Sequence, residues 1–277
     1  MTDKAAWQGE TGTAWAKHYS RTDRSFLGLT DRLLGRASAR EIARVLDIGC
    51  GAGELSMALG RGHPHAKIVG VDVSDELIEV AKRRGRNLMN VDFEVADVSE
   101  WDRSGFTPDL LVSRHGVMFF DEPVAAFSHL AEIASTDARL VFSCFRSVRE
   151  NLWAGEVASF LPAEASEEPV PGTPGPFAFA DPDHVEPILS EAGWRDIHFE
   201  PVDFAYVTGA GENPVEDAMA HFKVIGPAAR PLALLDGEQR RRFEAKLQDY
   251  LSRNLHSGIV ALPAAAWIVT AVRGQAD

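Results

Sequence analysis

The sequence predicts an α/β fold, namely a doubly wound, mostly parallel sheet of seven strands with N-terminal helices and a C-terminal helical cap inserted between the last strands. Apolar runs alternate with amphipathic segments between residues 43 and 145, as in sheets whose parallel strands are joined by helices. The first run leads into the glycine-rich stretch VLDIGCGAGELS, which is typical of a ligand site at a strand end. After residue 145, helices separate the last two strand-like runs.

The N-terminal half supplies five of the seven expected strands. Residues 5–37 predict helix, broken near the glycines, because aromatic and leucine side chains recur there at helical spacings. Apolar runs then predict strands at residues 43–49, 67–73, 91–98, 108–114 and 138–145. Helices are expected at residues 53–61, 74–85 and 121–134, and Ser74 stands at the N-cap position of the second.

The C-terminal half mixes helices with the last two strands. Helices are expected at residues 151–161, 181–194, 213–226 and 236–258, and strands at 195–207 and 264–273, which we expect to be neighbours. Asp181 and Pro182 are typical of a helix start, and Gly193 of a helix end. Residues 162–176 carry five prolines and three glutamates, and this composition predicts an acidic loop.

Composition restricts the classes of function. The 277 residues are 45% hydrophobic, enough for a large core. The net charge of −13 disfavours nucleic acid, because binding a polyanion requires an excess of Lys and Arg. Two cysteines make no disulfide framework or zinc spacing, and no membrane-spanning or secretory segment is recognised. We therefore expect a cytoplasmic protein with a small-molecule substrate.

The glycine loop departs from the known nucleotide motifs. Gly49, Gly51 and Gly53 give G-x-G-x-G, whereas the dinucleotide fingerprint is G-x-G-x-x-G, and Glu54 stands at its third glycine position. The Lys-Ser or Lys-Thr pair of the Walker phosphate loop is absent as well. Asp47 at the strand end would repel a diphosphate, so a ligand without phosphates, bearing an amino group, suits this loop better.

Two further acids follow the next two strands. Asp72 ends the second strand, where a carboxylate can accept hydrogen bonds from both hydroxyls of a ribose, in NAD as well as in adenosine. Asp97 ends the third strand, where it is placed to accept a hydrogen bond from the exocyclic amine of adenine. Together with Asp47, these acids favour a positively charged nucleoside with an amino-acid tail.

Four motifs in order resemble a known family. VLDIGCGAG, VGVDVS, FEVADV and LLVSRHGVMFFDEP are similar to the class I S-adenosylmethionine-dependent methyltransferases of the bacterial small-molecule type. The resemblance is strong over residues 40–145, and ILSEAGW and AAWIVTAVR resemble the C-terminal end of that family. It implies a Rossmann-like methyltransferase fold, S-adenosylmethionine as cofactor and no metal.

The resemblance also implies roles for individual residues. The loop would pass under the methionine part, Asp47 would lie near its ammonium, and Cys50 would fill space in the loop. Asp72 would hold the ribose. The other residues implied at the cofactor are Gly49, Gly51, Gly53, Val73, Asp97, Val98 and Ser113, with Trp15 and Tyr19 from the N-terminal helices.

The expected reaction is an in-line methyl transfer to O or N of a small molecule. His115 would accept a proton and Arg114 would orient an anionic group, both beside the sulfonium. An apolar or aromatic substrate is indicated by the content of residues 147–258, namely Trp153, Phe160, Phe177, Phe179, Phe222 and Tyr250. His221 and His256 are expected either at this pocket or at the surface. A nicotinamide-dependent oxidoreductase and a non-catalytic S-adenosylmethionine-binding protein remain as alternatives.

We expect a single domain over residues 1–277. Within it, residues 1–40 form an N-terminal helical cap, 41–146 a cofactor-binding core, 147–258 a substrate lid with late sheet elements, and 259–277 the final strand. His63 and His65 lack a third ligand, so no metal site is expected there. The sequence leaves the oligomeric state open, a homodimer included.

Overall fold

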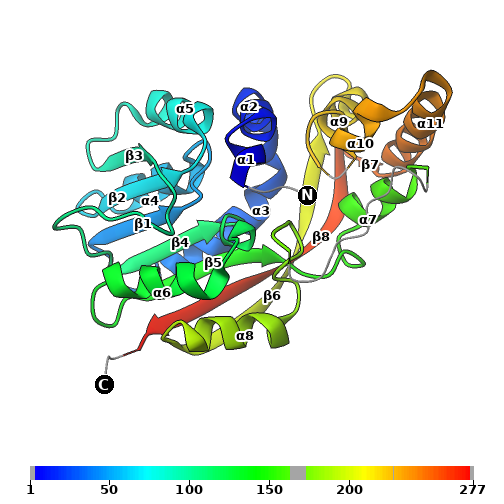
Figure 1. Ribbon diagram of the computed structural model, residues 1–277. Helices are drawn as coiled ribbons and strands as arrows, with labels where there is room; N and C mark the ends of the chain where they lie inside the picture. The colour runs from blue at the N-terminus through cyan, green and yellow to red at the C-terminus, as the bar shows by residue number, and fades with distance from the viewer. Residues whose placement is uncertain (1–3, 163–172, 227, 275–277) are drawn as a thin grey trace.

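The computed structural model describes residues 4–162, 173–226 and 228–274. Within them, eight strands form one sheet in the order β3-β2-β1-β4-β5-β8-β6, and β7 pairs with β8 (Figure 1). The strands are β1 Arg44–Ile48, β2 Lys67–Asp72, β3 Val91–Val95, β4 Leu110–Arg114, β5 Arg139–Phe145, β6 Trp194–Gly209, β7 Leu255–His256 and β8 Ile259–Arg273.

Five parallel strands form the N-terminal part of the sheet. β1 pairs in parallel with both β2 and β4, β3 extends the sheet beyond β2, and β5 extends it beyond β4. The strand order therefore reverses between β1 and β4. Such sheets bind ligands at the carboxyl ends of the strands beside this switch point. This arrangement confirms the predicted doubly wound, mostly parallel fold.

Two long antiparallel strands complete the sheet and leave it at one end. β8 pairs with β5 along one edge and with β6 along the other. β6 and β8 continue past the parallel strands into a lobe that carries four helices (Figure 1). The lobe consists of α7 Leu152–Ser159, α9 Pro214–Phe222, α10 Ala229–Leu234 and α11 Gly237–Arg253.

Helices cover both the sheet and its carboxyl edge. The N-terminal cover, residues 4–37, consists of α1 Lys4–Trp7, α2 Glu10–Lys17 and α3 Tyr19–Ala37. α3 buries Phe26, Leu29 and Leu33 at helical spacing and packs on the sheet, and α2 packs against α5 (Figure 1). The helices of the core are α4 Glu54–Gly62, α5 Asp75–Gly85, the 3-10 turn η1 Val117–Phe119, α6 Pro123–Ile133 and α8 Pro182–Glu191.

The structure differs from the expected elements in three places. The sheet gains an eighth strand, β7, because α11 ends at Arg253 and a tight hairpin follows, with Ser257 and Gly258 both at positive φ. α10 was not expected, and the N-terminal helix is interrupted at His18 in addition to the predicted break near the glycines, which lies at Gly9. The acidic loop expected at residues 162–176 lies mostly outside the described residues.

Among the described residues, no helix combines the length and the apolar character that a membrane crossing requires.

Gly53→Ala is predicted to destabilise the fold strongly. Gly53 has φ +81, and an added Cβ would lie 2.7 Å from the ring of Phe93, so the change adds backbone strain and a steric clash. We expect the free energy of unfolding to fall by about 3 kcal/mol in urea titrations.

Gly51→Ala is the matched control for this prediction. Gly51 also has positive φ, at +54, but no atom lies within 4 Å of an added Cβ. Only the backbone term of about 1 kcal/mol then applies. If both variants lost the same free energy of unfolding, the clash with Phe93 could not be the cause of the larger effect expected for Gly53→Ala.

Candidate functional site

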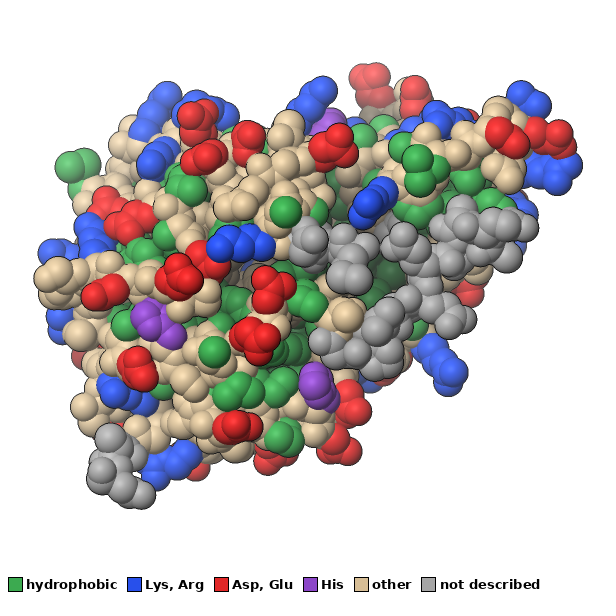
Figure 2. All heavy atoms as spheres, in the orientation of Figure 1, with side chains coloured by type: hydrophobic (Ala, Val, Ile, Leu, Met, Phe, Trp, Pro, Cys, Tyr) green, Lys and Arg blue, Asp and Glu red, His purple; other side chains and the backbone are tan. Residues whose placement is uncertain are grey.

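A cavity of about 1190 Å³ opens at the carboxyl edge of the parallel strands. Figure 2 shows hydrophobic side chains recessed in a hollow in the middle of one face. The wall of the cavity is built by the N-terminal cover, the glycine loop after β1, the loops after β2, β3 and β4, and the lobe. The cavity thus lies where the topology predicts a ligand, between the cover and the lobe.

The glycine loop presents bare backbone to this cavity. Gly49, Gly51 and Gly53 all have positive φ, which side-chain-bearing residues rarely adopt. The space beside the Cα of Gly51 is open, so a ligand can approach the main chain closely there. Cys50 lines the same stretch, and burial raises the pKa of its thiol, which therefore stays protonated.

Asp72 holds the glycine loop from the end of β2. One carboxylate oxygen accepts a hydrogen bond from the Gly51 N–H at 2.8 Å, and the other accepts one from the Ser74 N–H at 3.0 Å. Burial raises the pKa of Asp72, against the opposing effect of these backbone hydrogen bonds. The carboxylate thus lines the cavity in a fixed orientation.

Asp47 is buried beneath the loop at the end of β1. It is 1% exposed, and its carboxyl group accepts a hydrogen bond from the Ser56 hydroxyl at 2.5 Å. Burial raises its pKa to about 7, although the Ser56 hydrogen bond and the charge of Arg114 act in the opposite direction. A cation in the adjacent cavity would stabilise the ionised carboxylate.

Asp97 forms an ion pair with Lys4, a residue that no sequence motif marks. Lys4 of the N-terminal cover donates to one carboxylate oxygen at 2.5 Å, and the N–H and hydroxyl of Ser99 donate to the other. Burial raises the pKa of Asp97, but the hydrogen bonds from Lys4 and Ser99 outweigh it and hold the pKa below its usual value. Lys4 therefore closes the cavity over this acid.

His115 is a polar side chain of the cavity without a hydrogen-bond partner among the described residues. It is 9% exposed, and neither ring nitrogen has a hydrogen-bond partner among the described residues. Its ring stacks on Phe145 with 4.0 Å between centroids, and its backbone is left-handed, with φ at 61°. Burial, with a contribution from Arg114, lowers the pKa of the imidazole well below its ordinary value, so the ring is neutral. Strain and an unsatisfied buried group at one residue are typical of functional sites.

Aromatic rings surround His115 and form one end of the cavity. Phe26 contacts both His115 and Tyr206, and Tyr206 stacks on Trp153 at 4.7 Å. We call this end of the cavity the aromatic chamber. Six side chains line it, namely Phe26, His115, Phe145, Trp153, Phe177 and Tyr206.

The two later histidines lie elsewhere. His221 is fully buried behind the aromatic chamber, with Nε2 at 3.3 Å from the Tyr206 hydroxyl, and burial lowers its pKa to about 3. His256 is exposed on β7.

Arg114 lines the cavity, but its charge already has a partner. The guanidinium donates to Glu54 and to the Thr30 hydroxyl and lies over the ring of Phe26, 5.2 Å from its centroid. Glu54 neutralises the charge of Arg114. The role predicted for Arg114, which is to orient an anionic substrate, stays a prediction.

Most of the predicted site residues line one cavity. These are Trp15, Asp47, Gly49, Cys50, Gly51, Asp72, Val73, Asp97, Val98, Arg114 and His115. Three others lie behind its wall: Gly53 faces Phe93, the Ser113 hydroxyl donates to the Ile48 carbonyl at 2.7 Å, and Tyr19 lies under the guanidinium of Arg84. Their cofactor contacts stay predictions.

The aromatic residues expected in the substrate lid divide into two groups. Trp153 and Phe177 reach the cavity. The other four pack elsewhere, namely Phe160, Phe179, Phe222 and Tyr250. Lys4, Trp7 and Asp23 also line the cavity, and no local motif predicts them. In the described part of the chain, no group of three or more His, Cys, Asp or Glu side chains is arranged to hold a metal ion.

Comparison with known proteins finds similarity to methyltransferases. A family model described as a methyltransferase domain matches residues 45–137. The trans-aconitate 2-methyltransferase of Variovorax paradoxus is 38% identical over 79 residues, which are 28% of this chain and 29% of that protein. The malonyl-(acyl-carrier protein) O-methyltransferase of a Paenibacillus species is 26% identical over 224 residues, or 79% of this chain and 78% of the relative.

Solved structures share the fold at low sequence identity. The YcgJ protein of Bacillus subtilis has a TM-score of 0.54 and 16% identity, and the match covers 89% of this chain and 98% of that one. The phosphoethanolamine N-methyltransferase 2 of Haemonchus contortus, solved in complex with S-adenosyl-L-methionine, has a TM-score of 0.53 and 15% identity, covering 90% of this chain and 53% of that one.

Asp47→Asn is predicted to change how stability depends on pH. The folded pKa of about 7 exceeds the ordinary value of 3.8, so the folded protein holds this proton more tightly than the unfolded chain does. The resulting stabilisation is complete below about pH 3.8 and is lost as the pH rises to 7.

We therefore expect the variant to gain stability relative to the wild type between pH 4 and 8, by up to about 4 kcal/mol in urea titrations. Asp75→Asn, which removes an exposed carboxylate at the start of α5, is the control. The prediction would be contradicted if the free energy of unfolding changed with pH in the same way in the wild type and in Asp47→Asn.

Proposed function

This chain belongs to the class I S-adenosylmethionine-dependent methyltransferases, and on this premise we propose that it transfers a methyl group to O or N of a small apolar or aromatic molecule. One observation carries the proposal: a single cavity joins a polar end at the glycine loop to the aromatic chamber around a neutral His115. Its volume of about 1190 Å³ exceeds the upper range for a single small ligand, about 1,000 Å³, and so accommodates donor and acceptor together.

The residues at the polar end fit the methyl donor. S-adenosylmethionine, when bound, supplies a methyl group already activated by a sulfonium. Asp72 has fixed carboxylate oxygens for the ribose hydroxyls, and Gly51 leaves the approach to the loop open. Asp47 offers a carboxyl group beneath the loop for the ammonium of the methionine part, and Asp97 a carboxylate for the adenine amine. No phosphate-binding group is needed for this ligand.

The aromatic chamber fits the acceptor. Its rings favour a flat, apolar molecule and exclude water from the reacting groups. The two unpartnered ring nitrogens of His115 are available to accept the proton of a hydroxyl or amine as that group attacks the methyl. His115 then acts as general base, and the cavity aligns acceptor and donor.

A carboxylic acid is the second candidate acceptor. The relative aligned over most of this chain is named as an O-methyltransferase of malonyl-(acyl-carrier protein), and Lys223 adds a cation to the cavity wall, 2.9 Å from Glu244. A carboxylate is already ionised at neutral pH and does not need a general base. Dependence on His115 therefore separates the two candidates.

Location and assembly belong to the same proposal. We propose that residues 1–277 act as one domain on a small substrate in the cytoplasm, as a monomer or homodimer, without nucleic acid or a membrane. The net charge of −13 supports the absence of a nucleic-acid partner.

Asp72→Ala is predicted to weaken the binding of S-adenosylhomocysteine by about 10- to 100-fold, because it removes a charged acceptor of hydrogen bonds. Isothermal titration calorimetry measures this directly. Asp75→Ala, a few residues further on and exposed, is expected to bind as the wild type does. Wild-type protein that binds reduced nicotinamide instead would favour an oxidoreductase. Binding without methyl transfer to any member of a panel of phenols, amines and acids would favour a non-catalytic role.

His115→Asn is predicted to lower kcat by about 10²- to 10⁴-fold for hydroxyl and amine acceptors, with little change in the affinity for S-adenosylhomocysteine. Asn is chosen because it tolerates the left-handed backbone of this position. In the wild type, the lowered pKa of His115 keeps the base neutral, so its activity extends well below pH 6.5. Full turnover of the variant at every pH would exclude His115 as the base.

A further inference from the structure

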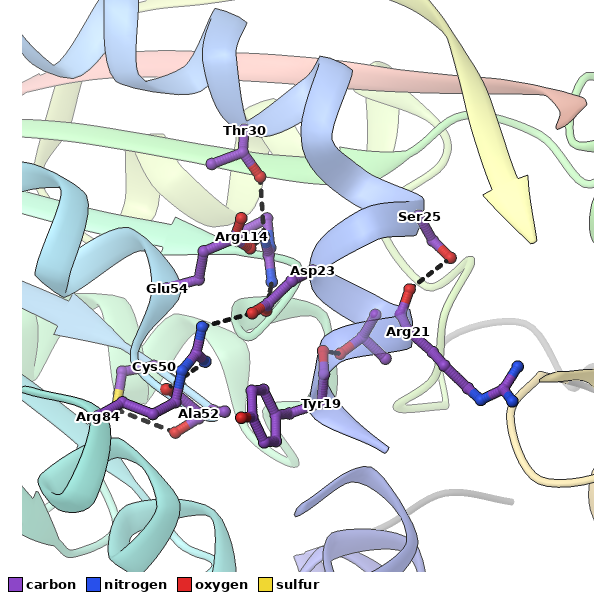
Figure 3. Close-up of polar contacts among 12 residues, drawn as sticks. Tyr19, Arg21, Asp23, Ser25, Thr30, Cys50, Ala52, Glu54, Arg84 and Arg114 are labelled. Atoms are coloured by element: carbon purple, nitrogen blue, oxygen red, sulfur yellow. Dashed lines mark hydrogen bonds and ion pairs between the residues drawn. The ribbon is translucent and has the colours of Figure 1, made fainter. Parts of the chain in front are cut away.

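Arg84 joins the glycine loop to the N-terminal cover. Its guanidinium donates to the carbonyl of Ala52 at 2.7 Å and to the carboxylate of Asp23 on α3 at 2.5 Å (Figure 3). The same group lies over the ring of Tyr19, 4.4 Å from its centroid. One side chain of α5 thus contacts the loop after β1 and two residues of the cover.

The contacts continue through Asp23 to the end of β4. The second carboxylate oxygen of Asp23 lies 3.9 Å from Arg114, which donates to Glu54 of α4 and to Thr30 of α3 (Figure 3). The four charged side chains are between 15% and 22% exposed. Ion pairs that are shielded in this way depend more strongly on both partners than pairs in open solvent do.

The position of Arg84 relates this network to the cavity. Ala52 follows Gly51, whose N–H is bound by Asp72 and beside whose Cα the cavity is open. On the other side, Asp23 lines the cavity together with Trp7 and Trp15 of the cover. The contacts of Arg84 therefore join the backbone beneath the proposed donor site to the helices above it.

We propose that Arg84 is a positioning residue that couples closure of the N-terminal cover to occupation of the donor site. The inference rests on the proposed function, because it takes S-adenosylmethionine as the ligand of the polar end. When Arg84 holds Ala52 and Asp23 together, the loop shape that binds the donor and the closed position of residues 4–37 are favoured as a unit. Donor binding then stabilises the cover, and the cover retains the donor, by the same factor.

The contacts at residue 84 suit a guanidinium better than an ammonium group. Two directed donors reach two acceptors on different elements while the planar face covers Tyr19. Lysine would keep the charge but offers a compact ammonium without the planar fork. Arg84→Lys is therefore expected to fall between the wild type and Arg84→Met.

The test compares Arg84→Met with Arg83→Met. Arg83 is the neighbouring residue on α5, and its pair with Glu79 at 3.7 Å is exposed. S-adenosylhomocysteine affinity is measured by calorimetry, and hydrogen exchange of residues 10–37 is measured with and without this ligand. We expect the ligand to protect residues 10–37 in the wild type and in Arg83→Met. In Arg84→Met we expect affinity to fall about 5- to 150-fold and the protection to be lost.

A second variant and a kinetic measurement separate positioning from general damage to the fold. Asp23→Asn removes the charge that Arg84 binds with little change of shape. Added to Arg84→Met, it is expected to weaken binding much less than it does in the wild type. With a methyl acceptor, KM for the donor is expected to rise more than kcat falls. Thermal unfolding without ligand identifies a variant that is merely unfolded, in which case Arg84→Lys and Asp23→Asn decide.

The outcomes are distinct. Wild-type protein that does not bind S-adenosylhomocysteine would overturn the proposed function itself. Wild-type binding combined with unchanged affinity and unchanged ligand-dependent protection in Arg84→Met would overturn only the positioning role. Additive effects of Asp23→Asn and Arg84→Met would do the same.

Discussion

The close approach of two loops at the ends of β1 and β4 determines the rest of the site. A Cβ on Gly49 would lie 2.9 Å from the Cα of Gly116, and one on Gly116 would lie 2.7 Å from the Ile48 carbonyl. Two backbones without side chains therefore meet at the switch point of the sheet. Because His115 immediately precedes Gly116, this contact holds the neutral imidazole beside the glycine loop. The donor end and the aromatic chamber can then share one cavity.

The charges around the cavity are distributed unequally between its two ends. Carboxyl groups lie at the carboxyl ends of β1, β2 and β3, where hydrogen bonds hold Asp47 and Asp72. The aromatic chamber has a neutral histidine instead. Under the proposed function, the cationic donor would bind where the acids lie, and an uncharged acceptor would contact the rings and the unpartnered nitrogen of His115. The division follows from the topology, since only the carboxyl ends of the parallel strands bring the acids together.

The sequence predicted what depends on local patterns. The parallel strands, the glycine loop and Asp72 follow from periodicity and spacing. Lys4 and Arg84 could not be found in this way, because their partners lie 93 and 61 residues away and belong to no motif. Phe179 and Phe222 were expected in the lid but fill the core, since composition does not tell which side of a helix or loop faces a cavity. The hairpin at Ser257 and Gly258 was not predicted, because the helical spacing of apolar residues before it led to a helix being expected as far as residue 258.

The long ladder of β6 and β8 connects the sheet to the lobe. Its sheet end adjoins β5 (Figure 1). Its far end carries the lobe and also contacts α3, because Arg24 donates to the carbonyl of Thr208 and pairs with Asp217 of α9. Within the lobe, α10 and residues 223–226 line the cavity, far along the chain from Asp47 and Asp72. Substitutions in α9 reach α3 as well, through Asp217. The wall at α10 can therefore vary in shape and polarity while the carboxyl groups at the ends of the parallel strands keep their positions.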